Sequence, residues 1–325
     1  MFKKIIVVLF LILLTCGFIY SDTLIRLYKG TEDYYKSKQR AKYYELQTNL
    51  QLQDITQKLI IDKSIPGDLK KPLINGERRI IIFKYPSGSE YVAGYLSYLP
   101  KGNHPTVIFL RGGNGYYGIM RPNNRFSFLK GYNVVATLYR GNVYGGKDEY
   151  GGADIQDVGN LIKFFPTLEK SAHIELKAPF AMLGISRGAM EMFTALSQLK
   201  YVKEKINYAI SASGSLDLNI SMKNRPEMYY LYKNKFKQSE IKSFAQWIKN
   251  RNPVDNVGEL SKSLKVLLIY GLDDHLVALE EQINFKKGLE SKGISVQLIT
   301  IPGATHGLED HYDDFEKHVF NFIKK

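Results

Sequence analysis

Short apolar runs alternate with amphipathic segments along most of this chain of 325 residues. Strands are predicted at 106–110, 132–139, 180–184, 206–213, 264–271 and 295–303, and helices at 154–168, 187–200, 278–292 and 311–324. Uninterrupted apolar strands that alternate with helices indicate a mostly parallel central sheet with helices on both faces. The chain is therefore predicted to be an α/β protein, with an irregular insertion rich in Tyr and Lys over residues 215–252.

Two other patterns precede this alternating region. Residues 79–101 hold two β-rich runs on either side of Pro86-Ser-Gly-Ser89, which predicts a hairpin. Residues 24–62 are polar, rich in Gln and Lys and free of proline, so they are predicted to form a solvated helix or stalk. We therefore expect a helical spacer and linker over residues 23–78 and one α/β domain over residues 79–325.

The N-terminus has the layout of an export signal or an uncleaved membrane anchor. Lys3 and Lys4 precede an apolar run over residues 5–20 that is broken only by Thr15, Cys16 and Gly17. This run is shorter than the roughly 20 residues that span a bilayer, which favours a cleaved signal over residues 1–22. The Leu13-Leu-Thr-Cys16 stretch also resembles a lipoprotein box. We expect an exported protein of the cell envelope, with periplasmic, secreted and membrane-anchored forms all left open.

Composition excludes several classes of function. The 45 Lys and Arg residues outnumber the 32 Asp and Glu residues, but they are scattered, and no nucleic-acid motif accompanies the net charge of +13. We therefore expect no nucleic-acid partner. Cys16 is the only cysteine, so the exported body has no internal disulfide, no Cys-ligated zinc and no catalytic thiol. No His-x-x-x-His spacing is present either, and we expect neither a metal nor a cofactor.

One motif carries chemistry. Gly184-Ile-Ser186-Arg-Gly188 matches G-x-S-x-G and lies between a predicted strand and a predicted helix. This is the context of a nucleophile elbow, in which the serine occupies a strained turn that only small neighbours tolerate. The alternative is a tight turn with an incidental serine.

A base and an acid for this serine follow later in the chain. His306 comes directly after the last predicted strand, and Asp273 and Asp274 come after the strand before it. The order serine, acid, histidine is that of α/β-hydrolases, and all of these residues follow the C-terminal ends of parallel strands, where such sheets place their sites. The sequence therefore predicts a catalytic triad on an α/β-hydrolase fold.

An oxyanion hole is predicted from two further positions. The backbone N–H of Arg187 follows the serine at the start of a helix, where amides have no hydrogen-bond partner within the helix. The second N–H is expected from the glycine-rich stretch 111–118 after strand 106–110, where glycine lets the backbone approach a ligand closely. Gly113 is the first candidate for this donor and Asn114 the second.

These features, together with three longer stretches, resemble the catalytic domain of the prolyl oligopeptidase family of serine peptidases. The three stretches are "YRGNVYGGKDEYGGADIQDV" over 139–158, "RPEM" over 225–228 and "RNPV" over 251–254. The resemblance covers roughly residues 80–325. It implies that Ser186 is the nucleophile, His306 the general base and Asp274 the acid that orients it, because in the family pattern the acid is the third residue after a glycine, here Gly271.

The resemblance implies a peptidase that acts on short peptides through an acyl-enzyme. Members that cleave peptides usually carry a β-propeller, and the residues between the leader and the hairpin are too few to form one. This leaves a second hypothesis open, an exported esterase with the same acyl-enzyme chemistry. A third hypothesis is a non-catalytic binding protein built on a hydrolase fold.

Overall fold

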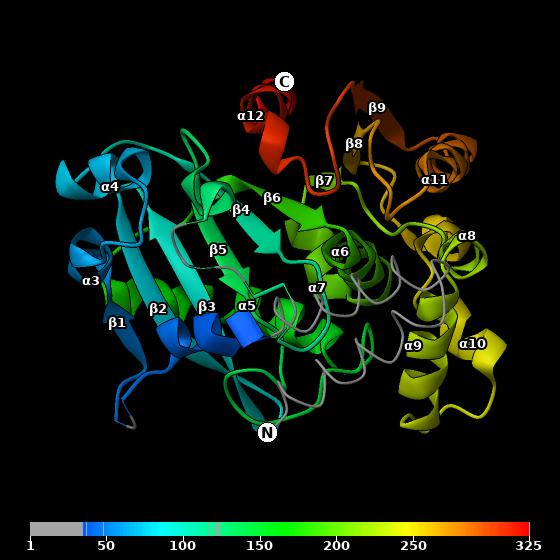
Figure 1. Cartoon of the computed structure of the whole chain (residues 1–325), viewed down its shortest axis with the longest axis horizontal. Helices are drawn as coiled ribbons and strands as arrows, with labels where there is room; N and C mark the ends of the chain where they lie inside the picture. The colour runs from blue at the N-terminus through cyan, green and yellow to red at the C-terminus, as the bar shows by residue number, and fades with distance from the viewer. Residues whose placement is uncertain are drawn as a thin grey trace, which may run out of the picture.

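A nine-stranded sheet forms the centre of the protein, in the order β1-β2-β3-β5-β4-β6-β7-β8-β9 (Figure 1). The computed structural model describes residues 35–36, 38–47, 49–116, 118–119, 121 and 124–324. The strands are β1 (Leu52–Asp54), β2 (Arg79–Ser87), β3 (Glu90–Tyr98), β4 (Pro105–Leu110), β5 (Asn133–Thr137), β6 (Lys177–Ile185), β7 (Tyr208–Ala212), β8 (Lys265–Gly271) and β9 (Ser295–Ile301).

The sheet is mostly parallel, as predicted. β5, β4, β6, β7, β8 and β9 are neighbours in that order, and each pairs in parallel with the next. β1, β2 and β3 add an antiparallel edge, in which β3 pairs with β5. The predicted hairpin is β2 and β3, and its turn contains Gly88 at a φ of +68°, a conformation that glycine adopts without steric cost. The α/β-hydrolase fold is therefore confirmed.

Helices cover both faces of the sheet. The helices are α3 (Thr56–Ile61), α4 (Gly67–Ile74), α5 (Ile155–Ala172), α6 (Arg187–Gln198), α7 (Lys200–Lys205), α8 (Leu218–Asn224), α9 (Pro226–Lys237), α10 (Phe244–Lys249), α11 (Leu279–Ser291) and α12 (Tyr312–Ile323). The 3-10 helices are η1 (Lys42–Tyr44), η2 (Arg125–Phe128), η3 (Pro253–Glu259) and η4 (Glu309–His311). One core cluster joins the sheet to α5, α6 and α11, and a second joins its other face to α12, η2 and the N-terminal segment.

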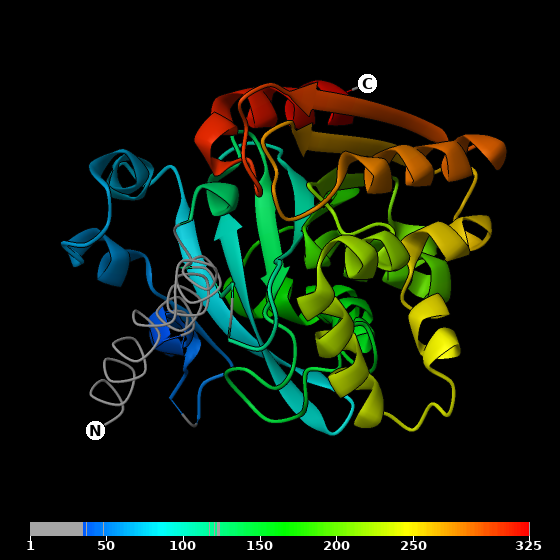
Figure 2. The same cartoon turned by 45° about the vertical axis from the view of Figure 1, so that its right-hand side comes forward.

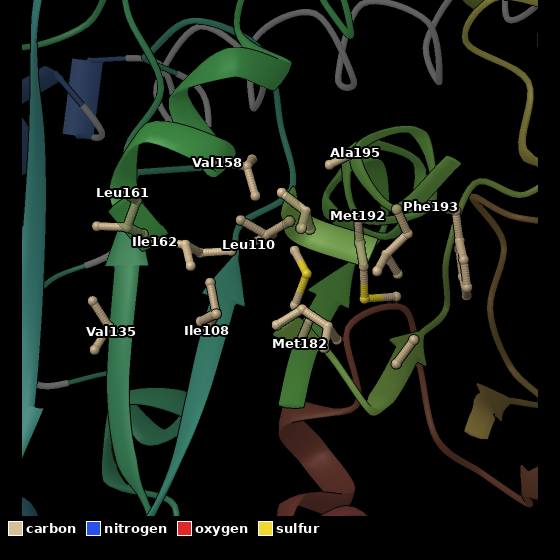
Figure 3. Packing of buried hydrophobic residues seen from close by; sticks show 14 of the residues in the cluster. Ile108, Leu110, Val135, Val158, Leu161, Ile162, Met182, Met192, Phe193 and Ala195 are labelled. Atoms are coloured by element: carbon tan, nitrogen blue, oxygen red, sulfur yellow. The ribbon is translucent and has the colours of Figure 1, made fainter. Parts of the chain in front are cut away.

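The strands divide their side chains between these two clusters. On β4, Ile108 and Leu110 pack in the first cluster, whereas Val107 and Phe109 pack in the second. Figure 3 shows the first cluster, in which Ile108 and Leu110 face side chains of α5 and α6. Because successive side chains of a strand point to opposite faces, a strand with apolar residues at every position must be covered on both sides.

The segment over residues 38–78 differs from the solvated spacer predicted for it. Tyr44 and Leu59 are fully buried, and β1 pairs with β2 as the edge strand of the sheet. In this part of the chain the spacer prediction is wrong, because a few apolar side chains among many polar ones are enough to dock the segment on the second cluster. The predicted leader over 1–22 lies outside the described residues.

The insertion over 215–252 is also ordered rather than irregular. It forms α8, α9 and α10, which Figures 1 and 2 show together at the side of the molecule opposite β1. The side chains of Tyr232 and Trp247 are fully buried in a third apolar cluster. Helix start signals were present in the sequence, since the side chain of Asp217 caps α8 and that of Ser243 caps α10. No helix in the described part of the chain is long and apolar enough to cross a membrane.

Candidate active site

Ser186 occupies a strained turn between β6 and α6. Its φ of 54° and ψ of −122° lie outside the regions that side-chain-bearing residues ordinarily adopt. Both glycines of the motif are required sterically. A Cβ atom on Gly188 would lie 2.0 Å from the carbonyl oxygen of Leu110, and one on Gly184 would lie 2.5 Å from the amide of Ala189. The turn is therefore compatible only with the small residues that the sequence supplies.

His306 and Asp274 form the second part of the site. His306 Nδ1 lies 2.8 Å from Asp274 Oδ2, and Asp274 Oδ1 accepts hydrogen bonds from the amides of Leu276 and Val277 at 2.8 and 3.0 Å. Burial favours the neutral acid, but the hydrogen bond from His306 and the two amides outweigh burial and lower the pKa of Asp274. Asp273 is exposed. Of the two adjacent acids, the structure thus places Asp274 on the histidine.

The serine and the histidine open into one cleft of about 1,040 Å³. Gly112, Gly113 and Asn114, from the loop after β4, line the same cleft. A Cβ atom on Gly112 would lie 3.1 Å from Cβ of Ser186, so this loop passes directly against the serine. The structure therefore brings together the loops after β4, β6, β8 and β9 that were predicted to carry the site.

The side chain of Arg187 joins the two predicted oxyanion donors. Its Nη1 donates a hydrogen bond of 3.0 Å to the carbonyl oxygen of Gly113, whose φ is +76°. The carbonyl of Gly113 is thereby held toward α6 by the residue whose own amide begins that helix. The oxyanion roles of the Gly113 and Arg187 amides remain predictions.

Arg187 is itself buried in a cluster of three carboxylates. It pairs with both oxygens of Asp148 at 2.8 Å, with Asp154 at 2.6 Å and with Glu191 at 2.9 Å. Burial alone would lower the pKa of Arg187, but these carboxylates raise it well above its ordinary value. Burial and the neighbouring Asp154 raise the pKa of Glu191 well above its usual range.

This cluster is not among the features predicted from the sequence. Asp154 is the residue before α5, but its side chain does not cap that helix, since its carboxylate accepts hydrogen bonds from the amides of Gly151 and Gly152 and pairs with Arg187. Asp148 also accepts a hydrogen bond from the amide of Gly115, so it braces the glycine-rich loop as well. The available signal was Glu191, a charged residue in the middle of an otherwise apolar helical stretch.

Asp148→Asn is expected to destabilise the protein and to lower kcat. The change leaves the buried Arg187 with weaker pairing and loosens the loop that carries Gly113. Breaking a buried ion pair typically costs about 3–5 kcal/mol, whereas an exposed pair contributes about 0–1 kcal/mol. The matched control is Asp54→Asn, which removes a half-exposed pair with Arg79, and neither of these residues lines the cleft. Urea denaturation and steady-state kinetics provide the measurements, and equal losses in the two variants would contradict the bracing role.

The described residues contain no group of three or more His, Cys, Asp or Glu side chains arranged to hold a metal ion.

Comparison with known proteins identifies the family. The model of the prolyl oligopeptidase family matches residues 122–325, which is more than half of the chain. A search of curated proteins returned no significant match.

Among solved structures, an acylaminoacyl peptidase of Pyrococcus horikoshii is similar with a TM-score of 0.60 and 20% identity. The alignment covers 77% of this chain and 42% of that one, so this chain spans less than half of the peptidase's length. An esterase of Pyrococcus furiosus is similar with a TM-score of 0.57 and 22% identity, over 80% of this chain and 95% of that one. A puromycin-hydrolyzing peptidase of Mycobacterium tuberculosis has a TM-score of 0.57 at 19% identity, over 76% of this chain and 39% of that one.

The similarity to solved structures shows the fold, and the match to the family model shows the family. A non-catalytic scaffold is disfavoured, because the elbow and the histidine–acid pair are both intact. The chain belongs to the prolyl oligopeptidase family of serine hydrolases.

Proposed function

We propose that the protein is a serine peptidase that cleaves short peptides through an acyl-enzyme. The observation that carries the proposal is that Ser186, at a strained elbow, shares one cleft with a histidine already paired to a buried acid. The acid holds Nδ1 of His306, which leaves Nε2 to act on the serine hydroxyl.

In this mechanism Ser186 Oγ attacks the scissile carbonyl carbon while His306 takes the hydroxyl proton. The negative charge that develops on the carbonyl oxygen is stabilised by the amides of Arg187 and Gly113. His306 then donates its proton to the leaving amine, the carbon–nitrogen bond breaks, and the acyl group remains on Ser186. A water molecule, deprotonated by His306, hydrolyses this acyl-enzyme and restores the free serine.

An esterase is the second candidate function. The similarity to the P. furiosus esterase extends over 95% of that chain, whereas the two peptidases are matched over 42% and 39% of theirs. The same three residues serve both reactions, since an ester and an amide differ only in the group that leaves.

We expect measurable cleavage of short peptide amides, with small esters cleaved faster. An alkoxide or phenoxide leaves more readily than an amine, which must first be protonated by the His306 imidazolium. Purified protein is assayed against matched amide and ester pairs with the same acyl part. Robust ester turnover without amide turnover across a broad peptide set would favour the esterase.

We also propose that the body of the protein acts outside the cytoplasm. The support is the leader-like pattern of Lys3, Lys4 and the apolar run over residues 5–20. Protease accessibility of the body in intact spheroplasts tests this proposal.

A further inference from the structure

Arginine dominates the charged lining of the active-site cleft. Among the described residues that line it are five arginines, a single carboxylate, Glu309, and neither lysine nor aspartate. The five arginines are Arg40, Arg121, Arg125, Arg187 and Arg225. Because Arg187 is neutralised by its own carboxylates, the remaining four give the cleft a net positive charge. Clefts lined by one sign of charge focus the electrostatic field and concentrate ligands of opposite charge.

Arg225 lies next to the loop that carries the acid of the triad. It precedes α9, and its Nη1 donates a hydrogen bond of 3.2 Å to the carbonyl oxygen of Leu276, two residues after Asp274. Its Nε pairs at 2.8 Å with Glu227, whose side chain is 61% exposed. An ion pair with so exposed a carboxylate contributes little, and Glu227 does not line the cleft. Arg225 therefore remains available to an anionic ligand.

Arg121 and Arg125 belong to the segment between β4 and β5. Arg121 Nη1 donates a hydrogen bond of 2.8 Å to the hydroxyl of Ser64, and the nearby Asp62 directs its oxygens to Tyr43 and Ser64. Arg125 lies 3.4 Å from Asp68, and both side chains are about half exposed, at 49% and 59%. Neither Asp62 nor Asp68 forms a close, buried ion pair with one of these arginines. Arg121 and Arg125 are therefore not neutralised in the way that Arg187 is.

We propose that this cleft selects anionic substrates, namely short peptides or esters that carry a carboxylate close to the scissile bond. The proposal rests on the proposed hydrolase function and adds the class of substrate to it. A guanidinium group offers a planar fork of donors that matches a carboxylate, and it stays charged at any pH at which the enzyme works. The cleft, at about 1,040 Å³, is at the upper end of the range for small-ligand sites. This size fits a short anionic substrate better than a folded protein.

The test compares two substrates that differ only in charge. One is succinyl-alanine 4-nitrophenyl ester, and the other is the same ester with its free carboxylate methylated. We expect kcat/KM to be about tenfold or more higher for the free carboxylate, because charge-assisted hydrogen bonds are worth about that much. The preference should shrink at about 1 M salt, where the screening length falls to about 3 Å.

Variants of the cleft arginines test whether these side chains cause the preference for the free carboxylate. In the triple variant Arg121→Gln, Arg125→Gln and Arg225→Gln the preference should fall to about twofold or less, since the arginines available to the anion are removed. The matched control is Arg79→Gln, an exposed arginine on β2 that pairs with Asp54 and does not line the cleft. This control should keep the preference. Equal kcat/KM for the two esters in the wild-type protein, or a preference that survives the triple variant, would overturn the proposal.

A binding experiment distinguishes failure of this inference from failure of the proposed function. Calorimetry with the Ser186→Ala protein compares succinyl-alanine amide with its methylated form, and tighter binding of the anion is expected without any turnover. If both esters are hydrolysed at equal rates, only the anion preference fails. If neither ester is hydrolysed but the anion still binds more tightly, the hydrolase function fails and the anion site stands.

Discussion

Ser186→Ala is expected to abolish both hydrolysis and covalent labelling by a fluorophosphonate. Removing the nucleophile of a serine hydrolase costs about 10⁶ in kcat, because the residual activity comes only from substrate binding and the oxyanion hole. Labelling is read by intact-protein mass spectrometry and turnover by release of 4-nitrophenol. The labelled peptide from the wild-type protein should contain Ser186.

A matched control is available within the same cleft. Ser215 also lines the cleft, and its backbone amide donates a hydrogen bond of 3.1 Å to the carbonyl oxygen of Ser186. Ser215→Ala keeps that amide and removes only the hydroxyl, so it should still be labelled. Labelling that persists in Ser186→Ala but disappears in Ser215→Ala would overturn the assignment of the nucleophile.

Asp274→Asn is expected to lower kcat by about 10⁴, the loss seen when the orienting acid of a serine protease triad is replaced by its amide. The amide of asparagine can donate a hydrogen bond to Nδ1 of His306, which would stabilise the tautomer that cannot accept the serine proton. The measurement is kcat at neutral pH, together with circular dichroism to show that the variant is folded.

The adjacent acid provides the control. Asp273→Asn changes an exposed residue that the structure does not pair with the histidine, and kcat should fall by less than about tenfold, as expected for a surface charge away from the reacting atoms. A larger loss of kcat in Asp273→Asn than in Asp274→Asn would show that the pairing of His306 with Asp274 is not the one used in catalysis.

Local physical rules made much of the fold and the chemistry readable from the sequence. Apolar runs such as 106–110 predict strands covered on both faces, and β4 places its alternate residues in two different cores. The elbow was readable because its requirements are local, since only glycine fits at 184 and 188 around a strained serine. The order of Ser186, Asp274 and His306 along the chain completed the prediction, because parallel strands place these loops at one edge of the sheet.

The tertiary structure decided what depends on residues far apart in the sequence. Asp148 and Asp154 reach Arg187 only because α6 packs against the loop after β5, so these two pairs have no local pattern. Only Glu191, an i,i+4 neighbour of Arg187 on α6, is close to it in the sequence. The docking of residues 38–78 was equally hidden, because Tyr44 and Leu59 stand in a largely polar segment and their burial depends on the sheet they contact. The residues of the cleft also converge from distant segments, with Arg225 following α8 and Arg121 following β4. Sequence patterns report the neighbours of a residue along the chain, whereas charge pairing and burial depend on its neighbours in space.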